Sequence, residues 1–238
     1  MLKYVLFDLD GTLLPLEQDE FIQTYFAALR KYVASRGVSE EKFFEPFKVG
    51  IYKMAKNDGS MTNEDAFWAV MESAIPSAKE KFTPILDDFY HNEFDKIVAV
   101  TKPSGMAREL VDFCKGLGLK TVLATSPIFP RIATEKRMAW VGLRPSDFLA
   151  VTTYENSRYT KPTAGYYTAL CSELGMNPSE CIMVGNDARD DLGAQDAGIS
   201  VFLLTNNFLN RKGVDVSHVP QGNENDLKKF ILEKVAEK

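Results

Sequence analysis

Histidine and cysteine are scarce in this sequence, with two histidines and three cysteines among 238 residues. The histidines lie far apart, and the cysteines are widely spaced in apolar or helix-like surroundings: Cys114, Cys171 and Cys181. An odd number of dispersed cysteines is typical of buried thiols in a reducing compartment rather than of a disulfide framework. The lack of a His and Cys cluster also argues against a zinc site.

An excess of positive charge and long hydrophobic runs are also missing. Lys and Arg number 28 against 33 Asp and Glu, and the formal net charge of −5 lacks the electrostatic signature of a general nucleic-acid binder. No run approaches the roughly 18 apolar residues of a membrane span. The apolar start, Met1–Phe7, ends in carboxylates instead of a cleavage site, so it predicts a strand. We therefore expect a cytoplasmic protein with neither a nucleic-acid nor a membrane partner.

Nucleotide-binding and serine-hydrolase motifs are absent as well. The chain contains no GxxxxGK[ST] and no GxGxxG, and the glycines of Gly116–Lys120 resemble either pattern only superficially. It also contains no GxSxG nucleophile elbow. Phosphate loops and serine nucleophiles are therefore poor explanations for this chain.

Short apolar runs followed by turns and helix-period segments make up most of the sequence. Runs that are apolar on both faces predict buried parallel strands, and their alternation with helices predicts a parallel α/β sheet. One helix is expected from Ala107 to Leu117 and another from about Asn225. The predicted strands are Tyr4–Phe7, Thr121–Ala124, Phe148–Val151, Cys181–Val184 and Val201–Leu204.

The stretch from about Leu16 to Ile97 interrupts this alternation, because its apolar residues have helical spacing and no convincing strand occurs. We expect a helix that ends at Gly37, one in which Pro46 resets or kinks the axis, one capped by Thr62, and one that begins near Pro84. Its many aromatic residues are interpreted as packing between helices rather than as ligand stacking. An all-helical insert is therefore predicted within the α/β sheet.

Two carboxylates directly follow the first predicted strand, in the run Asp8-Leu9-Asp10-Gly11-Thr12. Aspartate is depleted in strands, and at the carboxyl end of a parallel strand it points into the crevice where α/β sheets bind ligands. A Ca²⁺-binding EF-hand loop is rejected, because Thr12 and Asp19 stand where the third oxygen ligand and the final Glu belong. Asp8 and Asp10 are therefore candidates for catalysis.

Tyr4 to Thr12 matches hhhhDxDGT, where h is apolar, and in this the chain resembles the haloacid dehalogenase superfamily of hydrolases. The resemblance implies that Asp8 is the nucleophile and Asp10 the general acid and base. It also favours phosphate chemistry, since phosphatases and phosphomutases of the family carry the second Asp whereas dehalogenating members lack it. The implied fold is a doubly wound, Rossmann-like core, residues 1–16 and 98–238, with an inserted helical C1 cap, residues 17–97.

The family's next two motifs occur in the expected order. Val122-Leu123-Ala124-Thr125-Ser126 is an apolar strand ending in hydroxyls, which can donate to a phosphoryl oxygen, although strand-end Thr is common in ordinary turns. Lys161 precedes Pro162 and, read alone, is one of many solvated lysines. The resemblance assigns Thr125 and Ser126 to substrate binding, and Lys161 to both substrate binding and catalysis, where its charge would ease attack by one anion on another.

The fourth motif is acidic and follows the strand that begins at Cys181, in Gly185-Asn186-Asp187-Ala188-Arg189-Asp190-Asp191. One alignment uses Asn186 and Asp190, and the GNDxxxD alignment uses Asp187 and Asp191. We prefer the second, with Asp187 on a metal, Asp191 in support one helical turn later, and Asp190 facing elsewhere. An Asp-rich helix start that merely complements the helix dipole is the alternative.

Taken together, the resemblance implies a phosphatase that hydrolyses a small phosphorylated metabolite through an aspartyl phosphate on Asp8. The metal ligands would be Asp8, Asp10 and Asp187, and their hard oxygens favour Mg²⁺. A phosphomutase shares the same four motifs and stays open as an alternative. From other classes, a phospho-acceptor receiver module and a non-catalytic binding module are weaker alternatives, because a receiver lacks DxDGT and a large helical insert.

Overall fold

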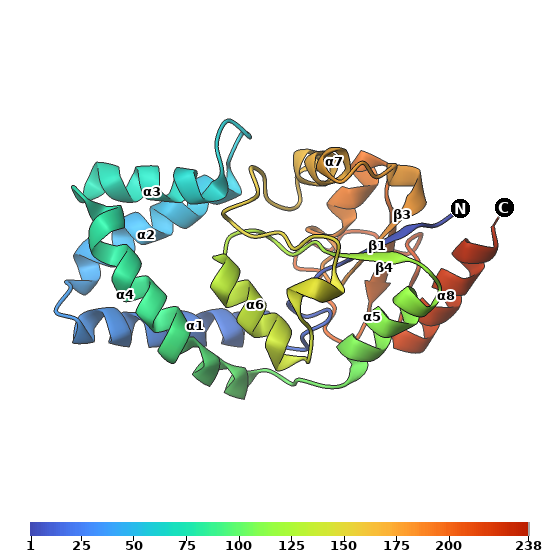
Figure 1. The fold of residues 1–238 in the computed structure, drawn as a ribbon, viewed down its shortest axis with the longest axis horizontal. Helices are drawn as coiled ribbons and strands as arrows, with labels where there is room; N and C mark the ends of the chain where they lie inside the picture. Colours follow the sequence, from blue (N-terminus) through green and yellow to red (C-terminus); the bar gives the residue numbers. More distant parts are fainter. Residues whose placement is uncertain (238) are drawn as a thin grey trace.

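The computed structural model describes residues 1–237, so residue 238, the end of the predicted core segment, lies outside the described residues. Within that range, the strands form one parallel sheet in the order β2-β1-β3-β4-β5. The predicted parallel α/β class is therefore confirmed (Figure 1). The strands are β1 (Tyr4–Phe7), β2 (Lys120–Leu123), β3 (Cys181–Gly185), β4 (Ser200–Leu204) and β5 (Gln221–Gly222).

Both faces of the sheet are buried under helices. Neighbouring strand residues alternate between two apolar clusters, so that Phe7 lies in one and Leu6 in the other. The first cluster includes α5 (Met106–Gly116) and α8 (Glu224–Ala236), and the second includes α7 (Ala164–Glu173). Helices on both faces make the sheet doubly wound, as the sequence predicts.

One predicted strand, Phe148–Val151, is wrong as a regular strand. The segment follows the 3-10 helix η2 (Pro145–Asp147) directly and forms a single parallel bridge, between Val151 and Leu123. Its backbone nevertheless bonds to the edge of β2, since Leu149 N donates to Thr121 O at 2.7 Å. The turn leaves too few extended residues for a regular strand.

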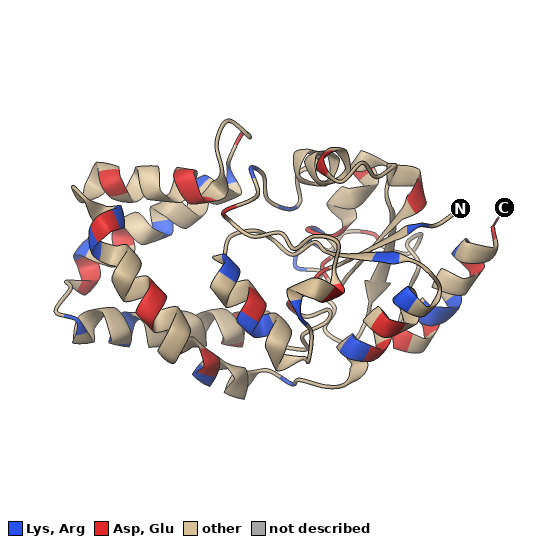
Figure 2. Ribbon diagram, viewed as in Figure 1, with Lys and Arg blue, Asp and Glu red and all other residues tan. Residues whose placement is uncertain are grey.

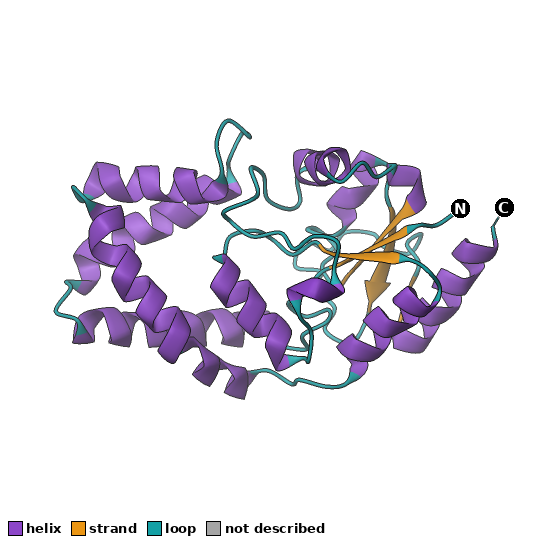
Figure 3. Cartoon of the chain, viewed as in Figure 1, coloured by secondary structure: helices purple, strands orange, loops and turns teal. Residues whose placement is uncertain are grey.

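The inserted helices are α1 (Gln18–Ser35), α2 (Glu40–Ala55), α3 (Asn63–Ala74) and α4 (Ala78–Asn92), followed by the 3-10 helix η1 (Phe94–Val100). Figure 3 shows this part of the molecule as helices joined by loops, without strands, beside the part that holds the sheet. Thr62 Oγ1 accepts a hydrogen bond from Asp65 N at 3.0 Å, which confirms the predicted cap of α3.

Neither proline begins a helix. Pro46 lies inside α2, which continues through it, so the helix is not reset there, and a kink at Pro46 stays a prediction. The helix expected to begin near Pro84 begins earlier, at Ala78, because Ser77 O accepts a helical hydrogen bond from Lys81 N at 3.0 Å. Ala78 and Phe82 are both buried on the same face, and this packing stabilises a first turn that lies before the proline.

The two chain segments that connect the insert to the sheet run side by side. Leu16 and Thr101 form an antiparallel bridge, and Lys102 N donates to Pro15 O at 2.8 Å. The helical elements extend from Gln18 to Val100, while the predicted division at residues 17–97 stays a prediction. Figure 2 shows both signs of charge interspersed along the helices. No helix among residues 1–237 is long and apolar enough to cross a membrane.

Candidate active site

The carboxyl ends of β1, β2 and β3 meet at one edge of the sheet, because the strands are parallel neighbours. A pocket of about 420 Å³ opens there. All of the residues proposed from the sequence line it, from segments far apart in the chain: Asp8, Asp10, Thr125, Ser126, Lys161 and Asp187. The structure therefore brings the whole predicted set to one place.

Lys161 links two carboxylates at the bottom of this pocket. Its Nζ lies 2.8 Å from Asp8 Oδ1 and 2.7 Å from Asp191 Oδ1, and the lysine side chain is only 1% exposed. Burial raises the pKa of Asp8 to about 7, although the positive charge of Lys161 acts in the opposite direction. Burial alone would lower the pKa of Lys161, but the charges of Asp191 and Asp8 raise it well above its ordinary value. The lysine is therefore a fixed cation beside Asp8.

Asp191 also shapes the turn after β3. Its Oδ2 accepts the backbone N–H groups of Asn186 and Asp187, each at 2.9 Å. Gly185 is required beside it, because a Cβ at that position would lie 2.0 Å from Asp191 Oδ2. Asp191 thus binds the backbone of the turn through Oδ2 and the ammonium of Lys161 through Oδ1. These contacts are those of a supporting residue.

Asp187 and Asp190 both line the pocket. Asp187 Oδ1 accepts the backbone N–H groups of Arg189 and Asp190, at 2.7 and 3.0 Å. The expectation that Asp190 faces elsewhere is wrong, because Asp187 to Asp191 form a single turn that leads into the 3-10 helix η4 (Leu192–Ala197) instead of an α-helix. Burial and then the nearby charge of Asp187 raise the pKa of Asp190 to about 6.

The turn after Asp10 packs against Asn186. Thr12 Oγ1 lies 3.0 Å from Asn186 Oδ1 and 3.3 Å from Asp8 Oδ2. Gly11 has a positive φ of 83°, and a Cβ there would lie 2.3 Å from Asn186 Nδ2. Glycine is therefore required at position 11 by both its backbone conformation and its neighbour.

Thr125 is fixed through its backbone. Its carbonyl oxygen accepts hydrogen bonds from Thr152 Oγ1 at 2.7 Å and from Tyr166 Oη at 3.0 Å. The residue is 2% exposed, and Ser126 beside it is partly exposed to the same pocket. Two hydroxyl-bearing residues are thus held at the end of β2.

The sequence does not predict Arg137, which contacts Asp10. Arg137 lies on α6 (Arg131–Trp140), is fully buried, and forms an ion pair between its Nη1 and Asp10 Oδ2. Its Nη2 donates to Thr134 Oγ1 at 3.2 Å, and its guanidinium lies 4.4 Å from the centre of the Phe129 ring. Asp10 Oδ1 is buried without a hydrogen-bond partner among the described residues. The sequence feature that could have indicated this role is the position of Arg137, a basic residue on the buried side of α6.

Comparison with known proteins identifies the family. The sequence model of the haloacid dehalogenase-like hydrolases matches residues 2–198. The chain belongs to this family. The resemblance seen in its motifs is therefore confirmed, and the protein is a hydrolase of the haloacid dehalogenase-like type.

The proteins that resemble this hydrolase in sequence or in structure bear the names of several activities. It is 28% identical over 201 residues to the N-acetylmuramic acid 6-phosphate phosphatase of Pseudomonas putida, covering 83% of this chain and 80% of that one. The 2-haloacid dehalogenase of Pseudomonas syringae pv. Tomato DC3000 is similar in structure, with a TM-score of 0.64, 18% identity and coverage of 98% and 99%. The β-phosphoglucomutase of Clostridium difficile has a TM-score of 0.58, 19% identity and coverage of 100% and 98%. The structural likenesses establish the fold.

Further cationic residues of the hydrolase line the pocket, and the sequence does not predict them. Arg189 comes from the turn after β3, and Arg211 and Lys212 come from the loop after β4. Arg211 also forms an ion pair of 2.5 Å with Asp19, in the first turn of α1. Arg189 lies within the fourth motif, where the sequence analysis assigned no role to it. Arg211 and Lys212 lie in a polar loop without a recognisable motif, so only the three-dimensional structure brings these two to the site.

The carboxylates of the hydrolase suit magnesium better than zinc. Among residues 1–237, no group of three or more His, Cys, Asp or Glu side chains is arranged to hold a metal by itself. Magnesium does not need one, because it commonly binds to one or two carboxylates and takes its other ligands from water and substrate phosphate. Asp8 and Asp187 line the same pocket and supply such oxygens. The donor chemistry therefore fits Mg²⁺.

Proposed function

We propose that this hydrolase is a Mg²⁺-dependent phosphatase that cleaves a small-molecule phosphate monoester through an aspartyl phosphate on Asp8. The observation that carries the proposal is the position of Asp8, which pairs with the buried Lys161 in the same pocket as Asp10 and Thr125. A carboxylate held beside a fixed cation can approach an anionic phosphate without the full repulsion between two anions.

The two oxygens of Asp8 have different surroundings. Oδ1 is bound by Lys161, whereas Oδ2 has, among residues 1–237, only the contact with Thr12 Oγ1 at 3.3 Å. We assign the attack on phosphorus to Oδ2. A lone pair of this oxygen forms the new O–P bond, the bond from phosphorus to the ester oxygen breaks, and its electron pair stays on the leaving alkoxide.

Asp10 is assigned the proton transfers. Its Oδ2 is held by Arg137. Oδ1 has no hydrogen-bond partner within the described part of the chain, so it is the oxygen left to give a proton to the leaving alkoxide. The same oxygen then removes a proton from the water that hydrolyses the aspartyl phosphate. Proton donation and proton removal by one group are ordinary for a two-step reaction.

The transferred phosphoryl group would lie among the hydroxyls of Thr125 and Ser126 and the ammonium of Lys161. Asp8 and Asp187 would hold Mg²⁺ through their carboxylates. We leave Asp10 out of this set, because Arg137 holds one of its oxygens and the other is assigned the proton transfers. When bound, the Mg²⁺ ion would neutralise charge on the phosphoryl oxygens. Arg189, Arg211 and Lys212 add positive charge around the same pocket, which favours an anionic substrate.

The relatives support phosphate chemistry, and the name of one of them, the Pseudomonas putida protein, is that of a phosphatase. The presence of Asp10 favours this over dehalogenation. A phosphomutase with the same site would transfer the phosphate to a sugar hydroxyl instead of water. Product analysis with a sugar phosphate separates the two, since only the phosphatase releases free phosphate.

The direct test is release of phosphate from p-nitrophenyl phosphate by the purified protein. We expect turnover with Mg²⁺, loss of turnover with EDTA, and recovery when Mg²⁺ is added in excess. Acid quenching during turnover of a radiolabelled ester should leave label on the protein, and Asp8→Asn should leave none. Phosphate release that persists in EDTA would contradict the metal requirement, and label retained by Asp8→Asn would contradict the nucleophile.

A further inference from the structure

A second cavity, about 220 Å³ in volume, lies between the inserted helices and the loop after β2. Its wall comes from α1, α2, α3 and α4 on one side and from residues 128–130 and Tyr154 on the other. The lining is strongly aromatic: Tyr25, Phe47, Phe67, Trp68 and Phe129 all contribute. Helical spacing predicts that these rings pack against one another, and several do, but together they also enclose a space.

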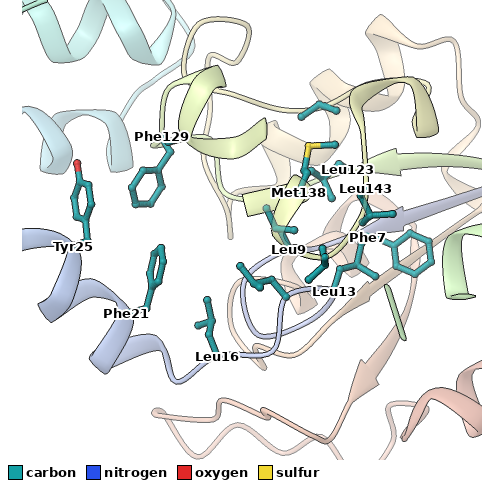
Figure 4. Close-up of a cluster of buried hydrophobic side chains, with 14 of the residues drawn as sticks. Phe7, Leu9, Leu13, Leu16, Phe21, Tyr25, Leu123, Phe129, Met138 and Leu143 are labelled. Carbon is teal, nitrogen blue, oxygen red and sulfur yellow. The ribbon is translucent and has the colours of Figure 1, made fainter. Parts of the chain in front are cut away.

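This apolar cavity adjoins the phosphate pocket. Ile22 lines both spaces, and the loop that brings Ser126 to the pocket continues directly to Ile128 and Phe129 in the cavity. Figure 4 shows Tyr25 of α1 facing Phe129, and the two ring centres are 5.2 Å apart. An ester with its phosphate in the pocket can therefore extend past Ile22 into the cavity.

The cavity also meets the groups assigned to proton transfer. The ring of Phe129 lies beneath the guanidinium of Arg137, at 4.4 Å, and Arg137 pairs with Asp10. Arg137 thus contacts both Asp10, the proposed proton donor, and Phe129, which lines the apolar cavity. The leaving group of an ester bound at Asp8 would then have its oxygen near Asp10 and its carbon skeleton toward Phe129.

The charges of the two spaces differ sharply. The phosphate pocket is lined by Lys161, Arg189, Arg211 and Lys212, whereas no Lys or Arg of the described chain lines the apolar cavity. The charged residue in its lining is Asp87, which is exposed. A carboxylate or a second phosphate in the cavity would lose its hydration without gaining a cation, which is costly.

The cavity offers little hydrogen bonding. The hydroxyls of Tyr25 and Tyr90 bond to each other at 2.8 Å, while Thr83 Oγ1 is buried without a partner among residues 1–237. An apolar cavity of about 150 Å³ is known to hold benzene. The volume here suits a single ring with a small substituent that Thr83 can hydrogen-bond.

We propose that the leaving group of the substrate is an uncharged, mainly apolar alcohol about the size of one aromatic ring. The proposal rests on the phosphatase function, because it needs the phosphate of the same molecule at Asp8. It separates this chain from its Pseudomonas putida relative, whose name gives a substrate that is an acid.

Three synthetic esters test the proposal in the wild-type protein: benzyl, methyl and 4-carboxybenzyl phosphate. Benzyl alcohol and methanol are similar in acidity, so the first pair differs in apolar size and not in leaving-group chemistry. The third adds one negative charge to the ring. We expect kcat/KM for benzyl phosphate to exceed that for each of the other two at least tenfold.

A positive charge placed in the cavity should weaken the preference for benzyl phosphate over 4-carboxybenzyl phosphate. Ile51 lines the cavity from α2, and Tyr52 beside it is 64% exposed, so Ile51→Lys and Tyr52→Lys form a matched pair. We expect Ile51→Lys to raise the ratio of kcat/KM for 4-carboxybenzyl over benzyl phosphate at least fivefold. Tyr52→Lys should keep the wild-type ratio.

The outcomes separate the two proposals. If no ester releases phosphate with Mg²⁺, the phosphatase function itself fails. If all three esters react with equal kcat/KM, or the carboxylate ester reacts fastest, the phosphatase stands and the apolar leaving group is wrong. If the Ile51→Lys protein does not fold, the comparison of the three esters in the wild-type protein decides the proposal.

Discussion

Arg137 and Asp10 form an ion pair although 127 positions separate them in the chain. The arginine is fully buried, and its guanidinium lies between the carboxylate of Asp10, the hydroxyl of Thr134 and the ring of Phe129. Helix α6 therefore determines where the second aspartate of the motif can lie. A residue that touches the proposed proton donor in this way should influence catalysis without contacting phosphate.

Replacing Arg137 by Met should slow the hydrolysis of esters with poor leaving groups more than the hydrolysis of esters with good leaving groups. A poorly held Asp10 transfers its proton less effectively, and only a basic leaving group needs that proton. We expect kcat for benzyl phosphate to fall about 10- to 100-fold, and kcat for 2,4-dinitrophenyl phosphate to change less than about threefold. Steady-state kinetics on both esters measure this.

Arg131→Met is the matched control, because Arg131 is an exposed arginine on the same helix. It should leave both rates unchanged. Equal losses on both esters in Arg137→Met would mean that Arg137 serves folding alone.

Replacing Asp8 by Asn should abolish turnover and preserve the fold. The substitution keeps the shape of the side chain but replaces the nucleophilic carboxylate by a neutral amide, and Lys161 retains its partner Asp191. We expect kcat to fall by more than about 10³-fold, with an unchanged circular dichroism spectrum. Turnover at the wild-type rate would rule out Asp8 as the nucleophile.

Lys161→Met should destabilise the protein as well as inactivate it. The substitution leaves Asp8 and Asp191 buried together without their cation, and breaking a buried pair of this kind costs about 3 kcal/mol or more. Urea unfolding should show a lower midpoint. Lys102→Met removes an exposed lysine and should change the free energy of unfolding by less than about 0.5 kcal/mol. Equal midpoints for the two variants would contradict the structural role of Lys161.

Gly185→Ala should damage the site through Asp191. The new Cβ would lie 2.0 Å from Asp191 Oδ2, so the carboxylate must move away from the turn and from Lys161. We expect lower kcat together with a lower melting temperature. Gly116→Ala meets no atom within 4 Å at the end of α5, and should leave kcat unchanged while stabilising the helix by up to about 1 kcal/mol. Matching behaviour of the two variants would show that position 185 tolerates a side chain.

The strands that the sequence predicts well are the buried central ones. β1, β3 and β4 are short runs that are apolar on both faces, and this pattern arises from burial under helices on either side. β5 was missed because Gln221 and Gly222 carry no apolar run and pair only through their backbone. Phe148–Val151 has the apolar pattern, but the preceding turn decides its structure.

The candidate site likewise contains residues that the sequence predicts and residues that it does not. Asp8 follows β1 directly, and Thr125 and Asp187 come shortly after the ends of β2 and β3. The parallel order of the sheet is therefore enough to bring the three together. The contacts of Arg137 and Arg211 depend on how α6 and a long loop pack in three dimensions, and no local pattern encodes that packing. The predicted orientation of Asp190 is wrong because helical spacing does not apply where the chain forms a single turn.

Because Leu16 and Thr101 pair with each other, the helical insert between them is one continuous stretch of sequence whose two ends lie side by side next to the sheet. Because the chain leaves and returns at neighbouring points, a short turn could join the two sides, and a different helical insert could be joined at the same place. Gene fusion at these two positions would then exchange selectivity between enzymes while Asp8, Lys161 and the parallel strands stay as they are. In this architecture, a new substrate can be acquired without altering the residues proposed to break the phosphate ester.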